Sequence, residues 1–185
     1  MNNVDYEINK ELGECYLFMG EYEKARDYYQ KAIGFNAEAS EPYMGLAAIA
    51  VQQGVLENAL TYYKKAHSLN PGEKSLTGMA MIEAELGKHE DAFQHFKGVL
   101  GEAPGNMMAI NSLLQLAYML KRIDEAVPYL EAALEPGDTE SVRYALAASL
   151  ITLGRDDEAK RHLEILLGEN PSNDSAKQLY AQFAA

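Results

Sequence analysis

The stretch LGECYLFMGEYEKARDYYQKAI, residues 12–33, carries the pattern that decides the fold. Ala25 lies within it, and an alanine returns after 34, 33, 34 and 33 residues, as Ala59, Ala92, Ala126 and Ala159. A second set stands five residues earlier, as Gly20, Gly54, Gly87 and Gly154, with Lys121 in the fourth slot. A period of about 34 residues is typical of stacked helix-turn-helix units, which cannot bury their apolar faces alone.

Numbering each repeat so that its alanine is position 20 divides the chain into residues 6–39, 40–72, 73–106, 107–139 and 140–173. Apolar or small residues recur at positions 4, 7, 8 and 11, and again at 20, 24, 27 and 28, so each repeat contains two amphipathic helical stripes. Glycine near position 15 ends the first helix, and proline at position 32 (Pro71, Pro104, Pro171) ends the second. Small residues at positions 8 and 20 let the two helices approach closely. No window alternates with period two for long, so the sequence predicts an all-α chain.

These features resemble the tetratricopeptide repeat (TPR) family, with its pattern of Leu-Gly, Tyr, Gly, Ala, aromatic and Ala. The resemblance covers about nine-tenths of the chain. It implies a right-handed α-solenoid of five hairpins in a single domain, residues 1–185, with a C-terminal capping helix at about 173–185. Leu179, Tyr180 and Phe183 give that helix its apolar side. Two departures stand out: position 4 never holds Trp, and Glu83 occupies position 11, normally apolar, which predicts looser packing there.

Composition narrows the choice of partner. The net charge is −12, from 28 acidic and 16 basic residues, which disfavours nucleic acid and anionic membrane surfaces. No apolar run approaches the roughly 18–20 residues that a membrane span needs, so we expect no membrane insertion. The N-terminal MNNVDYEINKE lacks the basic start and apolar stretch of a secretory signal, which makes a cytoplasmic location the default. The single cysteine, Cys15, is at position 10 and is expected to be a small buried residue.

Residues with catalytic or metal-binding chemistry do not converge in the sequence. His95 and His162 share position 23, expected to face outward, in repeats far apart along the chain. No set of three or four ligands has metal-binding spacing, and the glycines fall at helix ends rather than in a phosphate-binding loop. Acidic pairs such as Glu90–Asp91 open second helices, where the helix dipole favours negative charge. We therefore expect no enzyme activity, no cofactor and no metal.

The candidate binding surface is a stripe along the first helices. In the TPR family these helices line the concave wall of the superhelix, and positions 5, 9 and 12 point into it. Here that stripe is mostly apolar from repeat two onward, which suits the capture of a peptide or an amphipathic helix. The predicted groove residues are Met44, Val51, Met81, Met108, Asn111, Gln115, Tyr118, Tyr144 and Ile151. The alternative is that stripe residues pack against the next first helix, which we favour for Ala48, Ala84 and Ala148.

Some TPR proteins capture a C-terminal carboxylate with Lys, Asn and Arg on this wall. Lys10 matches, but Glu14 stands where asparagine would be needed, so the match is poor. The main hypothesis is a non-catalytic interaction scaffold whose partner is a protein or peptide with apolar anchors and basic flanks, steered by the acidic surface. One alternative is a self-assembly module, in which the uncapped first repeat, or the groove itself, docks onto a second copy and makes a homo-oligomer. Another is an accessory region of a larger enzyme such as a transferase.

Overall fold

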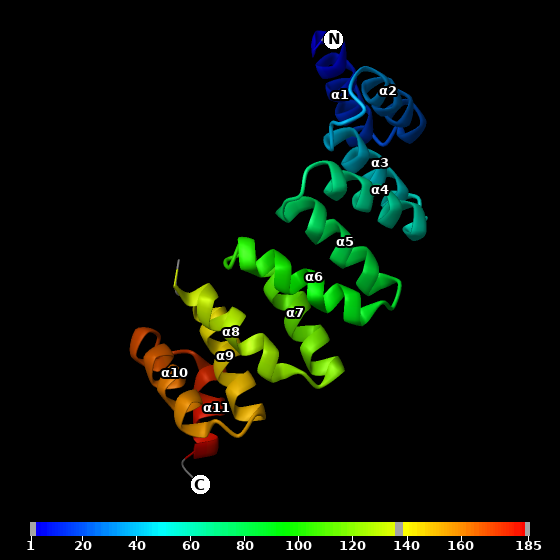
Figure 1. Ribbon diagram of the computed structural model, residues 1–185. Coiled ribbons are helices and arrows are strands. Elements are labelled where there is room, and N and C mark those ends of the chain that lie inside the picture. Colours follow the sequence, from blue (N-terminus) through cyan, green and yellow to red (C-terminus); the bar gives the residue numbers. More distant parts are fainter. Residues whose placement is uncertain (1–2, 136–138, 184–185) are drawn as a thin grey trace. The chain divides into compact units, whose positions relative to one another are not determined.

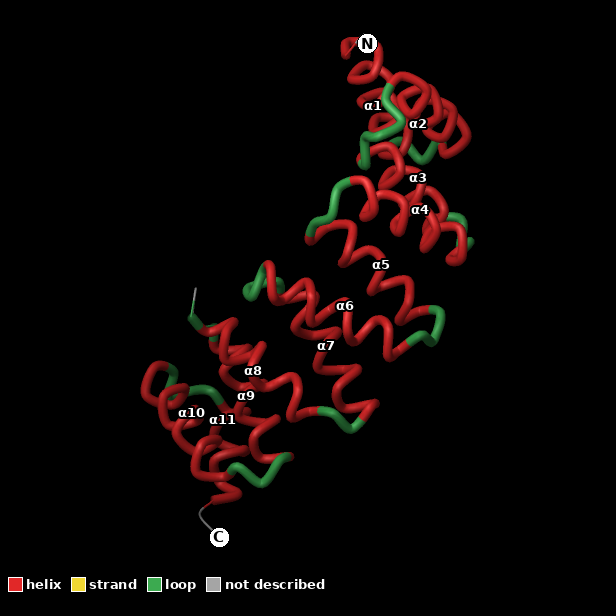
Figure 2. Tube along the Cα trace, viewed as in Figure 1, coloured by secondary structure: helices red, strands yellow, loops and turns green. Residues whose placement is uncertain are grey.

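The computed structural model describes residues 3–135 and 139–183, and within these the secondary structure is helical throughout (Figures 1 and 2). The α-helices are α1 (Asn3–Phe18), α2 (Tyr22–Phe35), α3 (Glu41–Gln52), α4 (Leu56–Leu69), α5 (Glu73–Glu85), α6 (His89–Glu102), α7 (Met107–Leu120), α8 (Ile123–Leu134), α9 (Glu140–Thr152), α10 (Asp156–Glu169) and α11 (Asp174–Tyr180), followed by a 3₁₀ turn, η1 (Ala181–Phe183). The predicted all-α class is confirmed.

The chain forms two compact units, Met1–His95 and Phe96–Ala185, which are described separately. That all 185 residues make one domain remains a prediction. The repeat boundaries also remain predictions, and residues 136–138 and 184–185, which belong to the predicted fourth repeat and capping helix, lie outside the described residues.

The turn inside each hairpin repeats one backbone conformation. Gly20, Gly54, Gly87 and Gly154 have φ angles of 77°, 72°, 74° and 72°, and Lys121, in the fourth slot, has a φ of 58°. A residue in the left-handed backbone conformation ends a helix. The conformational free-energy cost is small for glycine and higher for lysine. The second helices α4, α6 and α10 end at Leu69, Glu102 and Glu169, each two residues before a proline. Both sequence signals for helix ends are therefore confirmed.

Small residues bring the two helices of a hairpin together. The five periodic alanines, Ala25, Ala59, Ala92, Ala126 and Ala159, are all fully buried. In the first hairpin the Tyr29 ring packs against Gly13 so closely that a Cβ on Gly13 would lie 2.7 Å from ring atom Cδ1. The same ring reaches into the second hairpin, where a Cβ on Gly45 would lie 2.2 Å from Tyr29 Cζ. Glycine at these positions is required by the space that the ring takes.

The last hairpin is covered by α11, as predicted. Ala176 is fully buried in a cluster with Ala147, Leu163 and Leu166 of α9 and α10. Leu179, Tyr180 and Phe183 pack against the same cluster, and the Tyr180 hydroxyl donates a hydrogen bond to Glu164 Oε1 at 3.0 Å. Lys177 and Gln178, by contrast, are exposed. The capping helix thus turns its apolar side inward and a polar side outward.

The first helix has one uncovered face, and this overturns the prediction for Cys15, which is exposed. Position 10 is buried in the later repeats, where it holds Ile49, Ile82, Leu116 and Ser149. In the first unit, α2 packs on α3 and α4 packs on α5. The second helix of one hairpin therefore covers the first helix of the hairpin that follows it. No described helix precedes α1. The expectation of burial assumed such a covering helix over position 10, and within the described residues α1 has none.

Glu83 overturns a second prediction, because it lies in tight packing rather than loose packing. Its side chain is only 1% exposed, and its Oε2 lies 2.5 Å from His95 Nδ1 on α6. Lys64 Nζ lies 3.9 Å from the other carboxylate oxygen. The buried carboxylate therefore has a directed partner, as buried charges require.

Histidine at position 23 was expected to face outward, but in both repeats it turns partly inward. His95 is partly buried against Glu83, and His162 is partly buried with its Nδ1 3.2 Å from an Arg143 guanidinium nitrogen. Burial, and then the Arg143 charge, lowers the pKa of His162. The side chain is long enough to reach back from α6 or α10 to the first helix of its own hairpin.

Candidate functional site

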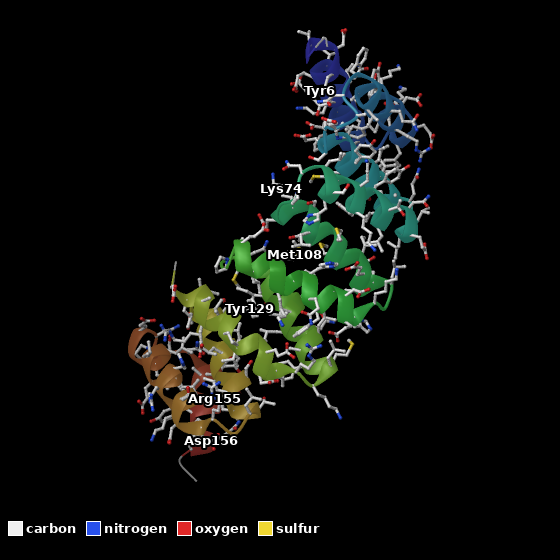
Figure 3. All side chains as sticks on the ribbon, in the orientation of Figure 1. Tyr6, Lys74, Met108, Tyr129, Arg155 and Asp156 are labelled. Carbon is white, nitrogen blue, oxygen red and sulfur yellow. The ribbon has the colours of Figure 1, made fainter. Side chains whose placement is uncertain are left out.

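One face of α7 carries four of the predicted groove residues. Met108, Asn111, Gln115 and Tyr118 follow one another at intervals of three and four residues, so they lie along the same side of the helix. All four are exposed, with Met108 at 44% and Tyr118 at 45%. The opposite side holds the buried Ile110, Leu113 and Ala117. We call these four residues the α7 face; Figure 3 labels Met108 near the start of the helix.

The sequence of α7 explains why this face is free. Asn106 precedes the helix, and its side-chain oxygen accepts a hydrogen bond from the Ala109 backbone N–H at 3.0 Å, which sets where the helix begins. The apolar residues of α7 then fall into two groups. The buried group, which includes Ile110, Leu113 and Ala117, packs inside the second unit, whereas Met107 and Met119 are exposed like the α7 face. Large apolar side chains left on a surface commonly mark a binding site.

The groove residues of the first unit are distributed differently. Met81, on α5, is exposed, whereas Val51, on α3, packs against the core cluster that contains Ala50 and Ile82. Met44 is half-buried and lines a pocket of about 540 Å³. Ala48 and Ala84 are also half-buried, in keeping with their expected packing role. Met44 in the first unit therefore lines a pocket, whereas the predicted groove residues of α7 form an exposed helix face.

This pocket, which we call the Tyr29 pocket, lies among α1, α3 and α5. The phenol end of Tyr29 lies under the Gly45 backbone, and Met44 stands beside it. Charged side chains surround this apolar floor. They are Glu14 from α1, Glu41 from α3, and Glu73 and Lys74 from the start of α5, where Figure 3 labels Lys74. Burial, and then the Glu14 charge, raises the pKa of Tyr29 to about 12, so its hydroxyl keeps its proton at neutral pH.

Tyr144 and Ile151, the last predicted groove residues, are both half-buried on α9. They pack against the cluster of Ala147, Leu163, Leu166 and Ala176 that joins the last hairpin to α11. Tyr144 also lines an open pocket of about 550 Å³ with Glu140 and Asn173. The Asn173 amide donates to Glu140 Oε1 at 2.5 Å, which ties the start of α11 to the start of α9. These two residues therefore share in the packing of the capping helix.

Three charged residues of the pocket escaped the sequence analysis: Glu41, Glu73 and Lys74. The available signal was the acidic residue that opens α3 and α5, a feature that the sequence analysis considered only for second helices. Their role becomes visible only in the structure, where the beginnings of α3 and α5 lie beside α1.

Within residues 3–135 and 139–183, no three His, Cys, Asp or Glu side chains are grouped so that they could hold a metal ion. Over the same residues, no helix has both the length and the apolar character needed to cross a membrane.

Paired helices with small-residue contacts and a shared turn define a helical-repeat protein. Sequence models of the tetratricopeptide repeat match residues 6–36, 40–73, 77–141 and 121–183. The chain belongs to the tetratricopeptide repeat family, and its fold is that family's α-solenoid.

Solved structures support the same fold. A tetratricopeptide repeat protein from Parabacteroides merdae aligns with a TM-score of 0.70 and 23% identity, over 97% of this chain and 74% of that one. YrrB, described as a TPR protein with an unusual peptide-binding site, aligns with a TM-score of 0.65 and 16% identity, over 92% of this chain and 89% of that one. At these identities the likeness concerns the fold alone.

Among characterised relatives, the BBSome complex member BBS4 of Bos taurus is 32% identical over 111 residues, 60% of this chain and 21% of that protein. The human protein O-mannosyl-transferase TMTC1 is 26% identical over 125 residues, 67% of this chain and 14% of that protein. The chain thus spans at most about a fifth of the length of these relatives. This similarity concerns the repeat region alone and says nothing about the activity of the larger proteins.

Proposed function

We propose that this chain is a non-catalytic scaffold that binds a peptide or helical segment of a partner protein along its first helices. The observation that carries the proposal is the α7 face. Its flexible methionine and rigid tyrosine offer apolar contact, and Asn111 and Gln115 between them can hydrogen-bond to a peptide backbone. This combination suits an extended or helical segment.

Peptides selected from a random library on the immobilised protein provide the test. We expect Tyr118→Glu and Met44→Glu each to weaken the selected peptides at least about tenfold, because each places a charge where an apolar anchor would be buried. Affinity is measured by fluorescence anisotropy with labelled peptide.

The matched control is Ile165→Glu. Ile165 is as exposed as Tyr118, but it lies on the second helix α10, away from the predicted groove residues. It should change affinity less than about twofold. If neither groove variant weakens binding, or if Ile165→Glu weakens it equally, the proposed surface is wrong.

A second candidate function, self-assembly, is favoured by the uncovered face of α1. Val4, Ile8, Cys15 and Phe18 are exposed along one side of this helix, with Phe18 at 93%. Their 4-3-4-3 spacing, with Glu11 in the middle, is that of a helix-pairing seam. We propose that two copies pair these helices antiparallel, which sets Val4 near Phe18 of the second copy and brings the two Glu11 carboxylates together.

The expected result is a concentration-dependent dimer in light scattering under reducing conditions. Ile8→Glu should abolish it, because a charge would be buried in the seam. Glu11→Gln should strengthen it, because two like charges no longer meet. If both the wild type and Glu11→Gln remain monomeric at high micromolar concentration, self-assembly through α1 is excluded.

A further inference from the structure

The Tyr29 pocket combines a small apolar floor with a negatively charged rim. Its lining includes three carboxylates, from Glu14, Glu41 and Glu73, and one ammonium group, that of Lys74. Glu41 Oε2 also accepts a hydrogen bond from the Tyr6 hydroxyl at 3.3 Å. The beginnings of α3 and α5 also border the pocket, and each helix N-terminus acts as about half a positive charge. Even with both included, the lining remains negative, so it favours a cation over an anion.

The arrangement of the carboxylates selects among cations. They belong to three different helices, so a cation that binds more than one of them needs several hydrogen-bond donors. A guanidinium group carries five N–H donors in a plane and can bond to several carboxylates at once, whereas an ammonium group is a compact point charge. The alkyl stem of an arginine would lie over Met44 and the phenol end of Tyr29.

The size of the pocket fits the same ligand. At about 540 Å³ its volume lies within the range of sites that bury a small-molecule ligand. Glu14 and Met44 also occupy the positions predicted to point into the groove, so the pocket opens where a bound segment would run.

We propose that the Tyr29 pocket takes an arginine side chain of the partner segment bound by this scaffold. The proposal rests on the proposed function and adds a residue-specific subsite to it. It commits to one occupant, a guanidinium group attached to a polypeptide, chosen by charge complementarity and by the spread of the carboxylates over three helices.

The test uses a minimal probe, N-acetyl-arginine N-methylamide, titrated into the ¹⁵N- and methionine-methyl-labelled full chain and followed by NMR. We expect saturable shifts of the Gly45 and Gly72 amides and of the Met44 methyl. The matched control probe is the citrulline analogue, which has the same shape without the charge. Its binding should be at least about threefold weaker, because it lacks a charge-assisted hydrogen bond.

Two protein variants complete the test. Glu14→Gln should weaken the arginine probe about two- to fivefold, a modest effect because Glu14 is exposed. Glu57→Gln removes the same charge from an exposed residue of α4 outside the pocket lining, and should leave the binding unchanged. Equal binding of the two probes overturns the proposal, and so does equal binding by Glu14→Gln and wild type.

Failure here is distinguishable from failure of the scaffold function. If the arginine probe does not bind but Tyr118→Glu still weakens the library peptides, the scaffold stands and the arginine subsite falls. If the probe binds at the pocket but Tyr118→Glu affects no peptide, the subsite stands and the α7 face is not part of the binding surface.

Discussion

Replacing Gly45 with alanine is expected to lower the free energy of unfolding by about 2–3 kcal/mol. The added Cβ would lie 2.2 Å from Tyr29 Cζ, far inside van der Waals contact, and the ring is almost fully buried. The ring cannot shift without disturbing its contact with Gly13. Urea unfolding followed by circular dichroism measures the change.

The same substitution at Gly34 is the matched control. Gly34 is an exposed helical residue of α2, and an added Cβ would meet nothing within 4 Å. There the change should stabilise the protein by about 0.5–1 kcal/mol, since alanine is the better helix former. In a Tyr29→Leu background the cost of Gly45→Ala should shrink. If Gly45→Ala and Gly34→Ala have the same effect, the packing described for Tyr29 is wrong.

Replacing His95 with leucine is expected to cost about 2–3 kcal/mol of stability at pH 7. Glu83 would then be left inside the protein without its partner 2.5 Å away, and Lys64, at 3.9 Å and largely exposed, could replace it only in part. The double variant Glu83→Leu/His95→Leu should recover most of that loss. It removes both polar groups and restores an apolar residue at position 11, where the fifth repeat has Leu150. A double-mutant cycle in chemical denaturation gives the coupling.

His162→Leu is the control for this cycle, because His162 shares position 23 but faces no buried carboxylate at position 11. It should be nearly neutral at pH 7. The lowered pKa of His162 means that the folded state binds fewer protons than the unfolded state, so this residue reduces stability as the pH falls through the ordinary value of 6.5. His162→Leu should therefore lose less stability than wild type between pH 7 and pH 5. Similar costs for His95→Leu and His162→Leu would contradict the role given to Glu83.

Much of the fold could be predicted because it depends on local, periodic features. The alanines at position 20 and the turn glycines recur in every hairpin or nearly so, and each repetition constrains the others. Cys15 was misjudged because the periodic pattern assigns the same environment to equivalent positions, whereas within the described residues no preceding helix covers α1. Glu83 was misjudged because a carboxylate in an apolar stripe resembles a defect until its partner twelve residues later is known.

The candidate site divides in the same way. The α7 face could be predicted, since four residues on one helix follow from spacing alone. The Tyr29 pocket could not, because Glu14, Glu41 and Glu73 come together only when three helices are placed in space. Spacing within a helix is visible in a sequence, but the meeting of helix ends is not.

The position of Tyr29 also bears on how the first unit opens. Its ring fills space against Gly13 in one hairpin and Gly45 in the next, and Tyr63 does the same toward Gly78. Repeat arrays often fray from an end, one unit at a time, because each repeat contacts only its neighbours. Here the first hairpin cannot detach without withdrawing an aromatic ring from the second. The first two hairpins therefore unfold as one cooperative block. Amide hydrogen exchange in α1 and in α3 should report the same free energy of opening.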